Sequence, residues 1–335
     1  MSRERGQKMP AKEKLKLSVG IWCMGGVSDR FLPQGYEEPL SIQERIQRVK
    51  KVPEVEAIEF FDDELEKIKP RELKSLLDDQ GLMVSCMNLN THSRPKWQLG
   101  ALTHRDEKLR REAIDAAKKV VDLTDLFQCD SVGLWLGVDG FDYPFEVDYG
   151  IEWDLLMKSL EEIADYGSHT KIALEYKLKE PRQYLLVGNA FRSLYLIKAL
   201  NRKNIGVTVD FGHALMAKEN PGEVVSILSK ENVLYNIHLN DAYREWDDDL
   251  IAGSTNLYET LEFLYYIDKS GYQGYLGFDI FPYRIHPVRA LELCARNTLD
   301  LYRLLKEIDK ESLFEGQKKM DAAQTHEAVR RVFFK

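Results

Sequence analysis

Residues 171–182 carry the densest group of side chains suited to chemistry in this sequence. An apolar run at 172–174 is followed by Glu175 and Lys177, and Glu180 comes shortly after them. Residues two apart in a strand point to the same side, so Glu175 and Lys177 are expected to share a face. A carboxylate and an ammonium buried at the end of a strand are costly unless something binds them. This arrangement predicts a site for a metal ion and a substrate.

Three later apolar runs of strand length also end in side chains that bind divalent metals. One such residue alone would be ordinary, because an aspartate at a strand end is usually a helix cap or loop residue. Four successive strand ends with carboxylate or imidazole groups suit Mg2+, Mn2+ or Co2+ better than a metal that prefers thiolates. The candidate ligands of this first metal site are Glu175, Asp210, His238 and Asp279.

A second group of candidate ligands accompanies the first. His213 follows Asp210 by three residues, and the segment WDDDL contributes Asp247 and Asp249. A carboxylate shared with the first group would bridge the two sites. Two ions held close together form a clamp for two oxygen atoms of a substrate.

Short apolar runs alternate with longer amphipathic segments along the whole chain. Apolar residues three and four apart in the longer segments predict helices. The expected strands are residues 17–22, 57–61, 82–88, 131–137, 171–177, 205–211, 233–240 and 274–281. The expected helices are residues 42–52, 71–80, 106–127, 151–166, 190–201, 223–229, 257–270 and 288–308.

Eight repeats of a strand and a helix predict a (β/α)8 barrel, a fold of the α/β class. A doubly wound sheet is the alternative, but it normally has fewer strands and a glycine-rich first turn. No GxGxxG motif follows Trp22. Barrel enzymes carry their chemistry on the loops after the carboxyl ends of the strands, so the candidate ligands are expected to converge at one mouth.

The barrel is expected to span residues 17–309 as one catalytic domain between two tails, 1–16 and 310–335. The C-terminal tail is polar and helix-like, with apolar residues such as Val329 and Phe333. It falls outside the eightfold repeat. We therefore expect it to pack on a neighbouring subunit or to fold back.

The composition indicates a soluble, cytoplasmic protein. A net charge of −8, from 47 basic and 55 acidic residues, argues against a nucleic acid or an anionic membrane as the partner. The four cysteines have no CxxC pairing and are expected to be buried free thiols of a reducing compartment. The sequence has neither an apolar signal core nor an apolar run of membrane-spanning length.

Several segments resemble the xylose isomerase family. LEYKLKEPR is similar to its Glu-x-Lys-x-x-Glu-Pro-Arg segment on strand five, and VDFGHA to its acidic-x-x-His segment on strand six. DDDLIAG is similar to its Asp-x-Asp-Leu metal loop, and FDIFPYR to its Phe-Asp-Tyr-Lys-Pro stretch on strand eight. The likeness covers roughly residues 17–305. A histidine on strand seven, His238, resembles the rhamnose isomerase branch and the sugar epimerases of the same superfamily.

The resemblance implies a xylose isomerase-like TIM barrel, a sugar isomerase or epimerase with one or two Mn2+, Mg2+ or Co2+ ions. Its substrate would be an unphosphorylated sugar or sugar derivative, and it would form a homodimer or homotetramer. Lys177 would donate a hydrogen bond to the carbonyl oxygen that becomes negative as hydrogen moves. The implied catalytic residues are Lys177, Glu175, His213 and Asp249. The implied ligands of the second ion are Asp210, His213, Asp247 and Asp249. The implied substrate-binding residues are Trp22, Phe61, Glu64, Asn90, His92 and Trp135.

Strand two departs from the family pattern. The family has His-x-x-Asp there, a pair that opens the sugar ring by proton transfer, whereas this chain has Phe61 and Glu64. Phenylalanine cannot move a proton. Another group such as His92 or Asp62 would have to replace the pair, or the substrate would arrive already open, or the reaction differs. Asn90 replaces a family phenylalanine and makes the substrate slot more polar.

Two other functions remain open on the sequence. A metal enzyme on this scaffold that cleaves a keto-sugar glycoside by proton abstraction and elimination would need no ring opening. A sugar-binding relative without catalysis would explain Phe61, but the chain keeps all of the costly candidate ligands. A DNA-repair endonuclease of the same superfamily is disfavoured by the acidic composition.

Overall fold

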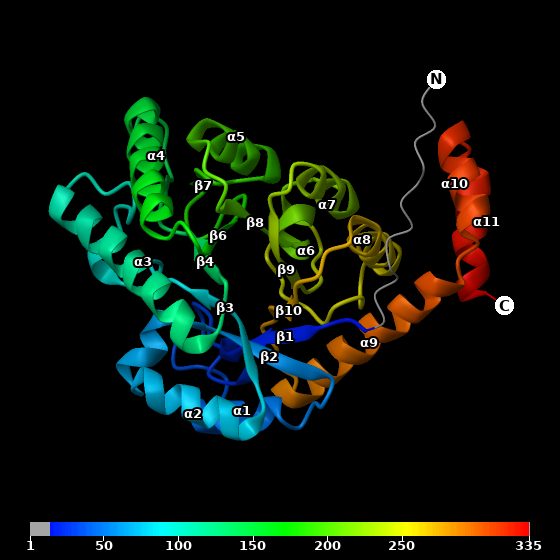
Figure 1. Cartoon of the computed structure of the whole chain (residues 1–335), viewed down its shortest axis with the longest axis horizontal. Helices are drawn as coiled ribbons and strands as arrows, with labels where there is room; N and C mark the ends of the chain where they lie inside the picture. The colour runs from blue at the N-terminus through cyan, green and yellow to red at the C-terminus, as the bar shows by residue number, and fades with distance from the viewer. Residues whose placement is uncertain (1–13, 335) are drawn as a thin grey trace.

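The computed structural model describes residues 14–334, and eight parallel strands close a barrel at its centre (Figure 1). The predicted (β/α)8 fold is confirmed. Each barrel strand pairs with its neighbours along the chain, and β1 closes the ring with β10. The strands are β1 (Leu17–Gly20), β2 (Val55–Phe61), β3 (Met83–Asn88), β4 (Ser131–Trp135), β6 (Lys171–Glu175), β8 (Ile205–Asp210), β9 (Leu234–Leu239) and β10 (Leu276–Phe278).

Helices between the strands cover the outside of the barrel. They form where the sequence has an apolar stripe, as on α3, where Ala113, Ala117 and Val121 are buried four residues apart. Several also have clear end signals: Ser41 and Glu44 form a capping box at the start of α1, and Gly81 ends α2 in the left-handed conformation. The main helices are α1 (Ile42–Val49), α2 (Pro70–Gln80), α3 (Glu107–Phe127), α4 (Tyr149–Tyr166), α5 (Ala190–Leu200), α7 (Pro221–Lys230), α8 (Leu257–Ser270) and α9 (Pro287–Glu307).

Some strands end earlier than the sequence predicts. β8 stops at Asp210, and the short helix α6 (Phe211–Met216) begins at the next residue. The backbone N–H of His213 donates to Asp210 Oδ1 over 2.8 Å, so Asp210 is the N-cap of α6. The sequence prediction missed α6 because six residues are too few to show a helical period.

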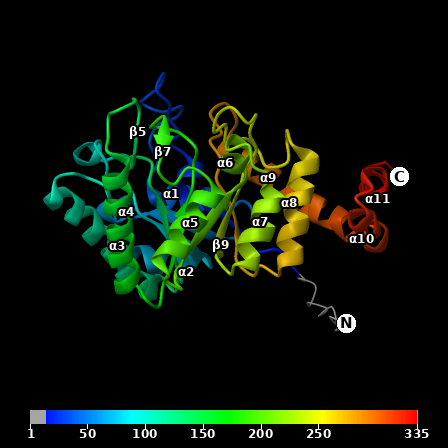
Figure 2. The same cartoon turned by 90° about the horizontal axis from the view of Figure 1, so that it is seen from above.

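A small second sheet joins two of the loops at the mouth of the barrel (Figure 2). β5 (Gly140–Phe141), after β4, pairs antiparallel with β7 (Tyr184–Leu185), after β6. The rings of Phe141 and Tyr184 stack with centroids 5.1 Å apart. Arg182 Nη1 also donates to Asp142 Oδ2 over 2.8 Å. Sequence reasoning did not predict this sheet, because each of its strands has only two residues.

The C-terminal tail forms two helices, α10 (Lys310–Lys319) and α11 (Ala322–Phe333), beyond the end of α9. The ring of Tyr258 on α8 lies 5.1 Å from that of Phe333 and 5.9 Å from that of His326. The tail therefore folds back against α8. The expected N-terminal tail lies outside the described residues except for 14–16, and the division into a domain and two tails stays a prediction.

All four cysteines are buried and unpaired, as predicted. Among the described helices, none combines the length and the apolarity that crossing a bilayer would need. The cytoplasmic location stays a prediction.

Gly133 on β4 tests the packing inside the barrel. A Cβ atom there would overlap Asn88 Oδ1 and lie 3.3 Å from Cys86 Sγ, so Gly133→Ala must displace a buried side chain. We expect it to lower the free energy of unfolding by about 1–3 kcal/mol, measured by urea denaturation. Gly150→Ala is the control, because a Cβ atom there would meet only the exposed Asp148, at 3.3 Å from Oδ1. Equal stability of the two variants would contradict the packing described here.

Candidate functional site

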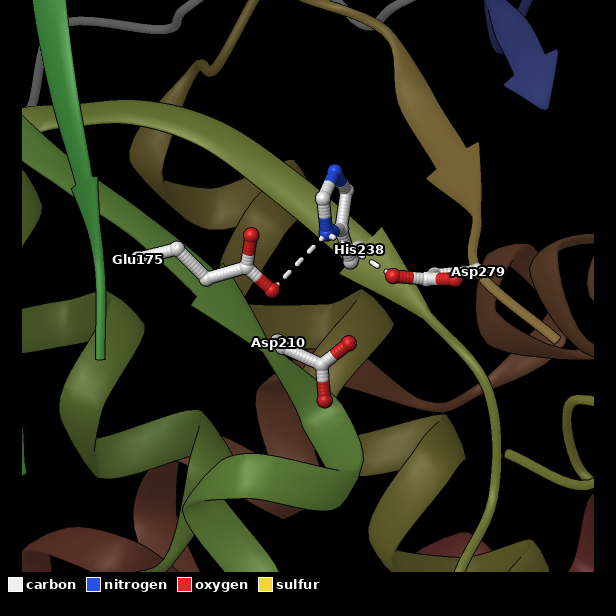
Figure 3. A group of neighbouring side chains, drawn as sticks. All are labelled: Glu175, Asp210, His238 and Asp279. Atoms are coloured by element: carbon white, nitrogen blue, oxygen red, sulfur yellow. Dashed lines mark hydrogen bonds and ion pairs between the residues drawn. The ribbon is translucent and has the colours of Figure 1, made fainter. Parts of the chain in front are cut away.

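The four candidate ligands of the first metal site meet at the carboxyl ends of four adjacent strands. Glu175 and Asp210 end β6 and β8, His238 lies on β9, and Asp279 follows β10. One ligand atom from each lies within 4.8 Å of the other three. Glu175 and Asp279 face each other, with His238 between them and Asp210 to one side (Figure 3). The structure thus brings these four residues together, while their binding of a metal stays a prediction.

Only three of the four candidate ligands of the second site lie close together. Ligand atoms of Asp210, His213 and Asp247 lie within 4.8 Å of one another, but Asp249 is not part of this group. Asp249 is linked to it by Asn240, whose Nδ2 donates to Asp249 Oδ1 over 3.0 Å and to Asp210 Oδ2 over 2.8 Å. Asp210 is shared by both groups, as the sequence predicts for a bridging carboxylate.

Lys177 is directed to the second group. Its ammonium lies 2.6 Å from Asp247 Oδ2 and also pairs with Glu180. The same oxygen of Asp247 lies 3.1 Å from His213 Nε2. The ammonium is buried, 4.9 Å from the centre of the Trp135 ring. Lys177 therefore supplies a fixed positive charge where a second metal ion was expected.

Buried carboxylates repel one another at this site. Burial raises the pKa of Asp279 to about 7, against the attraction of His238. Burial likewise raises the pKa of Asp210 above its ordinary value, against the attraction of His213. Burial also raises the pKa of Asp249 well above its ordinary value, and the charge of Asp247 adds to the effect. A cation among these oxygens would relieve the repulsion.

The histidine of the second group is stabilised in its charged form. Burial disfavours the charged form of His213, but Asp210 and Asp247 overcome this and raise its pKa to about 9. His213 Nδ1 and Asp247 Oδ1 are buried without a hydrogen-bond partner among the described residues. The donor set that fits a hard divalent cation is therefore that of the first group, with three carboxylates and an imidazole.

An arc of aromatic rings covers the other half of the mouth. Trp22, Phe61, His92 and Trp135 follow one another, with neighbouring ring centroids 4.7, 5.4 and 4.6 Å apart. They lie at the ends of β1 to β4, whereas the candidate metal ligands come from β6 to β10. Trp22 Nε1 donates to Asp279 Oδ1 over 2.7 Å and connects the two halves. The mouth thus has an apolar wall opposite a charged one.

Two atoms of this aromatic arc are free to bind a polar ligand. His92 Nδ1 and Trp135 Nε1 are buried and have no hydrogen-bond partner among the described residues. Burial lowers the pKa of His92 to about 4, so its ring is neutral at neutral pH. A neutral ring with a free nitrogen can bind a hydroxyl group.

The other candidate substrate-binding residues are already engaged by the protein. Arg45 Nη2 donates to Glu64 Oε2 over 2.6 Å, in a buried pair. Asn90 Nδ2 donates to Asp63 Oδ2 over 2.9 Å, and its Oδ1 accepts from Ser93. Glu64 and Asn90 therefore hold the loops near the mouth, and their contact with a substrate stays a prediction.

Sequence reasoning missed a layer of polar residues directly below the candidate ligands. Asn236 precedes His238 by two residues and shares its side of the strand. Glu59 and Asn88 reach the same layer from β2 and β3. A polar residue two positions before a candidate ligand was the available signal for Asn236. Glu59 and Asn88 had no such signal, because only barrel closure brings their strands opposite β9.

Residues 46–303 match a family model described as the xylose isomerase-like TIM barrel, and the chain belongs to this family. The chain is similar to the xylose isomerase of Thermus thermophilus. The two are 27% identical over 313 residues, which cover 88% of this chain and 80% of the relative.

Solved structures give the same fold. An L-ribulose 3-epimerase matches with a TM-score of 0.68 and 13% identity, over 87% of this chain and 96% of that one. A 3-keto-D-glucoside 4-epimerase from E. coli matches with a TM-score of 0.63 and 16% identity, over 87% of this chain and 99% of that one. At these identities the likeness establishes the fold alone.

Asp279→Asn tests whether the buried charge of Asp279 destabilises the metal-free protein. The raised pKa means that Asp279 destabilises the folded state progressively as the pH rises from about 4 to about 7. Asparagine carries no charge and can still accept from Trp22. In the presence of a chelator, we expect the variant to be more stable than wild type by about 1–3 kcal/mol at about pH 8.

The pH dependence of this difference is the control. At about pH 5 the folded Asp279 is protonated, so the advantage of the asparagine shrinks by about 2 kcal/mol. Urea denaturation at both pH values measures the effect. An advantage independent of pH would show that Asp279 is not destabilised by its charge.

Proposed function

We propose that this protein is a divalent-metal-dependent isomerase or epimerase of an unphosphorylated sugar or sugar derivative. The observation that carries the proposal is the convergence of Glu175, Asp210, His238 and Asp279 within 4.8 Å at the mouth of the barrel. The relatives named above support it, since they are a xylose isomerase and two sugar epimerases. A cytoplasmic homodimer or homotetramer remains part of the proposal.

Glu175 and Asp279 are the proposed groups that move the proton. A Mn2+, Mg2+ or Co2+ ion held by the four residues would stabilise negative charge on adjacent substrate oxygens. Glu175 and Asp279 face each other across the centre (Figure 3). A carboxylate on each side of a carbon atom can remove a proton from one face and return one to the other. This arrangement supports inversion or migration of a C–H bond next to a carbonyl group.

Lys177 supports chemistry with one metal ion in place of two. Its ammonium pairs with Asp247 and Glu180, so the second group already holds a cation. An ammonium has three N–H donors, and two of them are directed to these carboxylates. The third is available to the oxygen that becomes negative during proton transfer. One metal ion with a lysine favours proton transfer over a hydride shift between two metals.

The aromatic arc supports a substrate that needs no ring opening. Phe61 stands in the middle of the arc and has no proton to give. His92 is neutral and weakly basic, because burial lowers its pKa to about 4. Asp62 accepts from the backbone of Asn90 and lies 3.6 Å from Arg94. Burial raises the pKa of Asp62, but its carboxylate is held by Asn90 and Arg94, and this favours an open-chain sugar or a keto-sugar.

A second candidate function is elimination on a keto-sugar glycoside. Exposed aromatic side chains on the loops after β1, β4 and β9 favour it. The side chain of Phe145 is 99% exposed, and those of Phe31, Tyr243 and Trp246 are also exposed. An apolar group attached to the sugar would cover such residues. The enzyme would then cleave the glycosidic bond and would not interconvert sugar isomers.

The test is a panel of unphosphorylated pentoses, hexoses, keto-sugars and keto-glycosides, incubated with the Mn2+-loaded protein in D2O. We expect an isomer or epimer that carries deuterium at the carbon next to the carbonyl group, because a proton on a carboxylate exchanges with solvent. NMR identifies the product and its label. Product without deuterium would indicate a hydride shift, and cleavage would select the second candidate function. Turnover of none of these substrates would rule out both.

Glu175→Gln is the matched variant for this panel. Loss of a carboxylate ligand should abolish both metal binding and turnover. Unchanged metal content in this variant, measured by atomic absorption, would contradict the assignment of Glu175 as a ligand.

Lys177→Met separates the lysine from the metal. The lysine pairs with the second group, so we expect the metal content to remain and kcat to fall by roughly 100-fold, as for the loss of one oxyanion donor. Lys171→Met, at the exposed start of β6, is the control and should keep the wild-type rate. A wild-type kcat for Lys177→Met would remove the lysine from the reaction.

A further inference from the structure

Glu59 is a buried carboxylate that the proposed reaction does not use. It lies on β2 inside the barrel, and only 1% of its surface is exposed. Its Oε2 lies 3.2 Å from His238 Nε2. The interior of such a barrel is normally filled by bulky branched apolar side chains. A carboxylate buried there is costly, so its presence requires an explanation.

The two ring nitrogens of His238 face opposite ways. Nδ1 faces the candidate metal site, 3.2 Å from Glu175 Oε1 and 3.8 Å from Asp279 Oδ2. Nε2 faces Glu59, below the site. An imidazole that binds a metal through one nitrogen carries its proton on the other. A metal on Nδ1 therefore leaves an N–H on Nε2, and Glu59 is placed to accept it.

The surrounding strands hold Glu59 in this position. Asn88 Nδ2 donates to its Oε2 over 3.1 Å, and Asn236 Nδ2 donates to its Oε1 over 3.3 Å. Two glycines leave the room that this arrangement needs. A Cβ atom on Gly277 would lie 2.8 Å from Glu59 Oε1, and one on Gly133 would overlap Asn88 Oδ1. Residues of four other strands thus accommodate one carboxylate.

We propose that Glu59 is a positioning residue that fixes the ring of His238 and directs Nδ1 at the metal. It accepts the Nε2 proton, sets the tautomer, and increases the electron density on Nδ1. Carboxylate partners of metal-binding histidines act in this way, and losing one weakens metal binding by roughly 10–100-fold. The inference rests on the proposed function, because it assumes that the first group of ligands binds a divalent ion.

In the experiment, the purified, chelator-treated chain is titrated with Mn2+, and the affinity is measured by calorimetry. We expect Glu59→Gln, which keeps the size of the side chain and removes its charge, to bind Mn2+ roughly 10–100-fold more weakly than wild type. Glu152→Gln is the matched control. Glu152 is also a buried carboxylate, but it pairs with Arg105 on the outside of the barrel, so its variant should bind Mn2+ as wild type does.

Glu59→Asp is the second variant. It keeps the charge but shortens the side chain, so its affinity for Mn2+ should lie between those of wild type and Glu59→Gln. If Glu59→Gln does not fold, Glu59→Asp tests the role of Glu59 in its place. NMR of protein labelled with 15N-histidine and loaded with Mg2+ gives an independent signature. The Nε2 proton of His238 should shift upfield in Glu59→Gln as the hydrogen bond to a charged acceptor is lost.

The outcomes separate the two proposals. No Mn2+ binding by the wild-type chain would refute the proposed metal site itself. Binding by wild type with equal affinity in Glu59→Gln, or in Glu59→Asp if the first variant is unfolded, would refute only the role of Glu59. An equal loss in Glu152→Gln would show that any buried carboxylate has the same effect, and would also overturn the assignment.

Discussion

Repulsion between buried carboxylates at the carboxyl ends of adjacent strands is the constraint on which the rest of this structure depends. The barrel brings the acidic groups of β6, β8 and the segment after β10 within 4.8 Å. Positive groups are correspondingly placed around them, with His238 inside the first group and His213 and Lys177 beside the second. Like charges this close in a dry environment need a counter-charge. His213 and Lys177 supply part of it, and the proposed cation, bound to a neutral His238, would supply the remainder.

The sequence was sufficient to predict the barrel and the residues that meet at its mouth. Apolar runs alternating with amphipathic segments define the eight strands, and the chemistry at the strand ends identifies Glu175, Asp210, His238 and Asp279. The local sequence pattern could not reveal which residues these side chains contact. Glu59 and His238 are 179 positions apart and meet only through barrel closure. The sequence predicts that Lys177 shares a strand side with Glu175, but β6 ends at Glu175, and the ammonium of Lys177 pairs with Asp247 from a later loop.

The division of the mouth into two halves connects fold with reaction. Strands β1 to β4 present aromatic rings, and strands β6 to β10 present charged groups. An apolar wall excludes water and strengthens every electrostatic interaction opposite it. Trp22 belongs to both halves, since it contacts Phe61 and donates to Asp279. The replacement of a proton carrier by Phe61 extends the apolar wall and reduces the proton-transfer capacity of that side.

The small sheet of β5 and β7 also affects how the site exchanges its contents. A backbone ladder, a ring stack and an ion pair tie the loop after β4 to the loop after β6. These two loops follow Trp135 and Lys177, so one cannot swing outward without carrying the other. Across the mouth, the loops after β1 and β10 also pack together, with the ring centroids of Tyr36 and Tyr283 5.1 Å apart. Loop engineering for altered turnover would accordingly have to change the loops of each pair together.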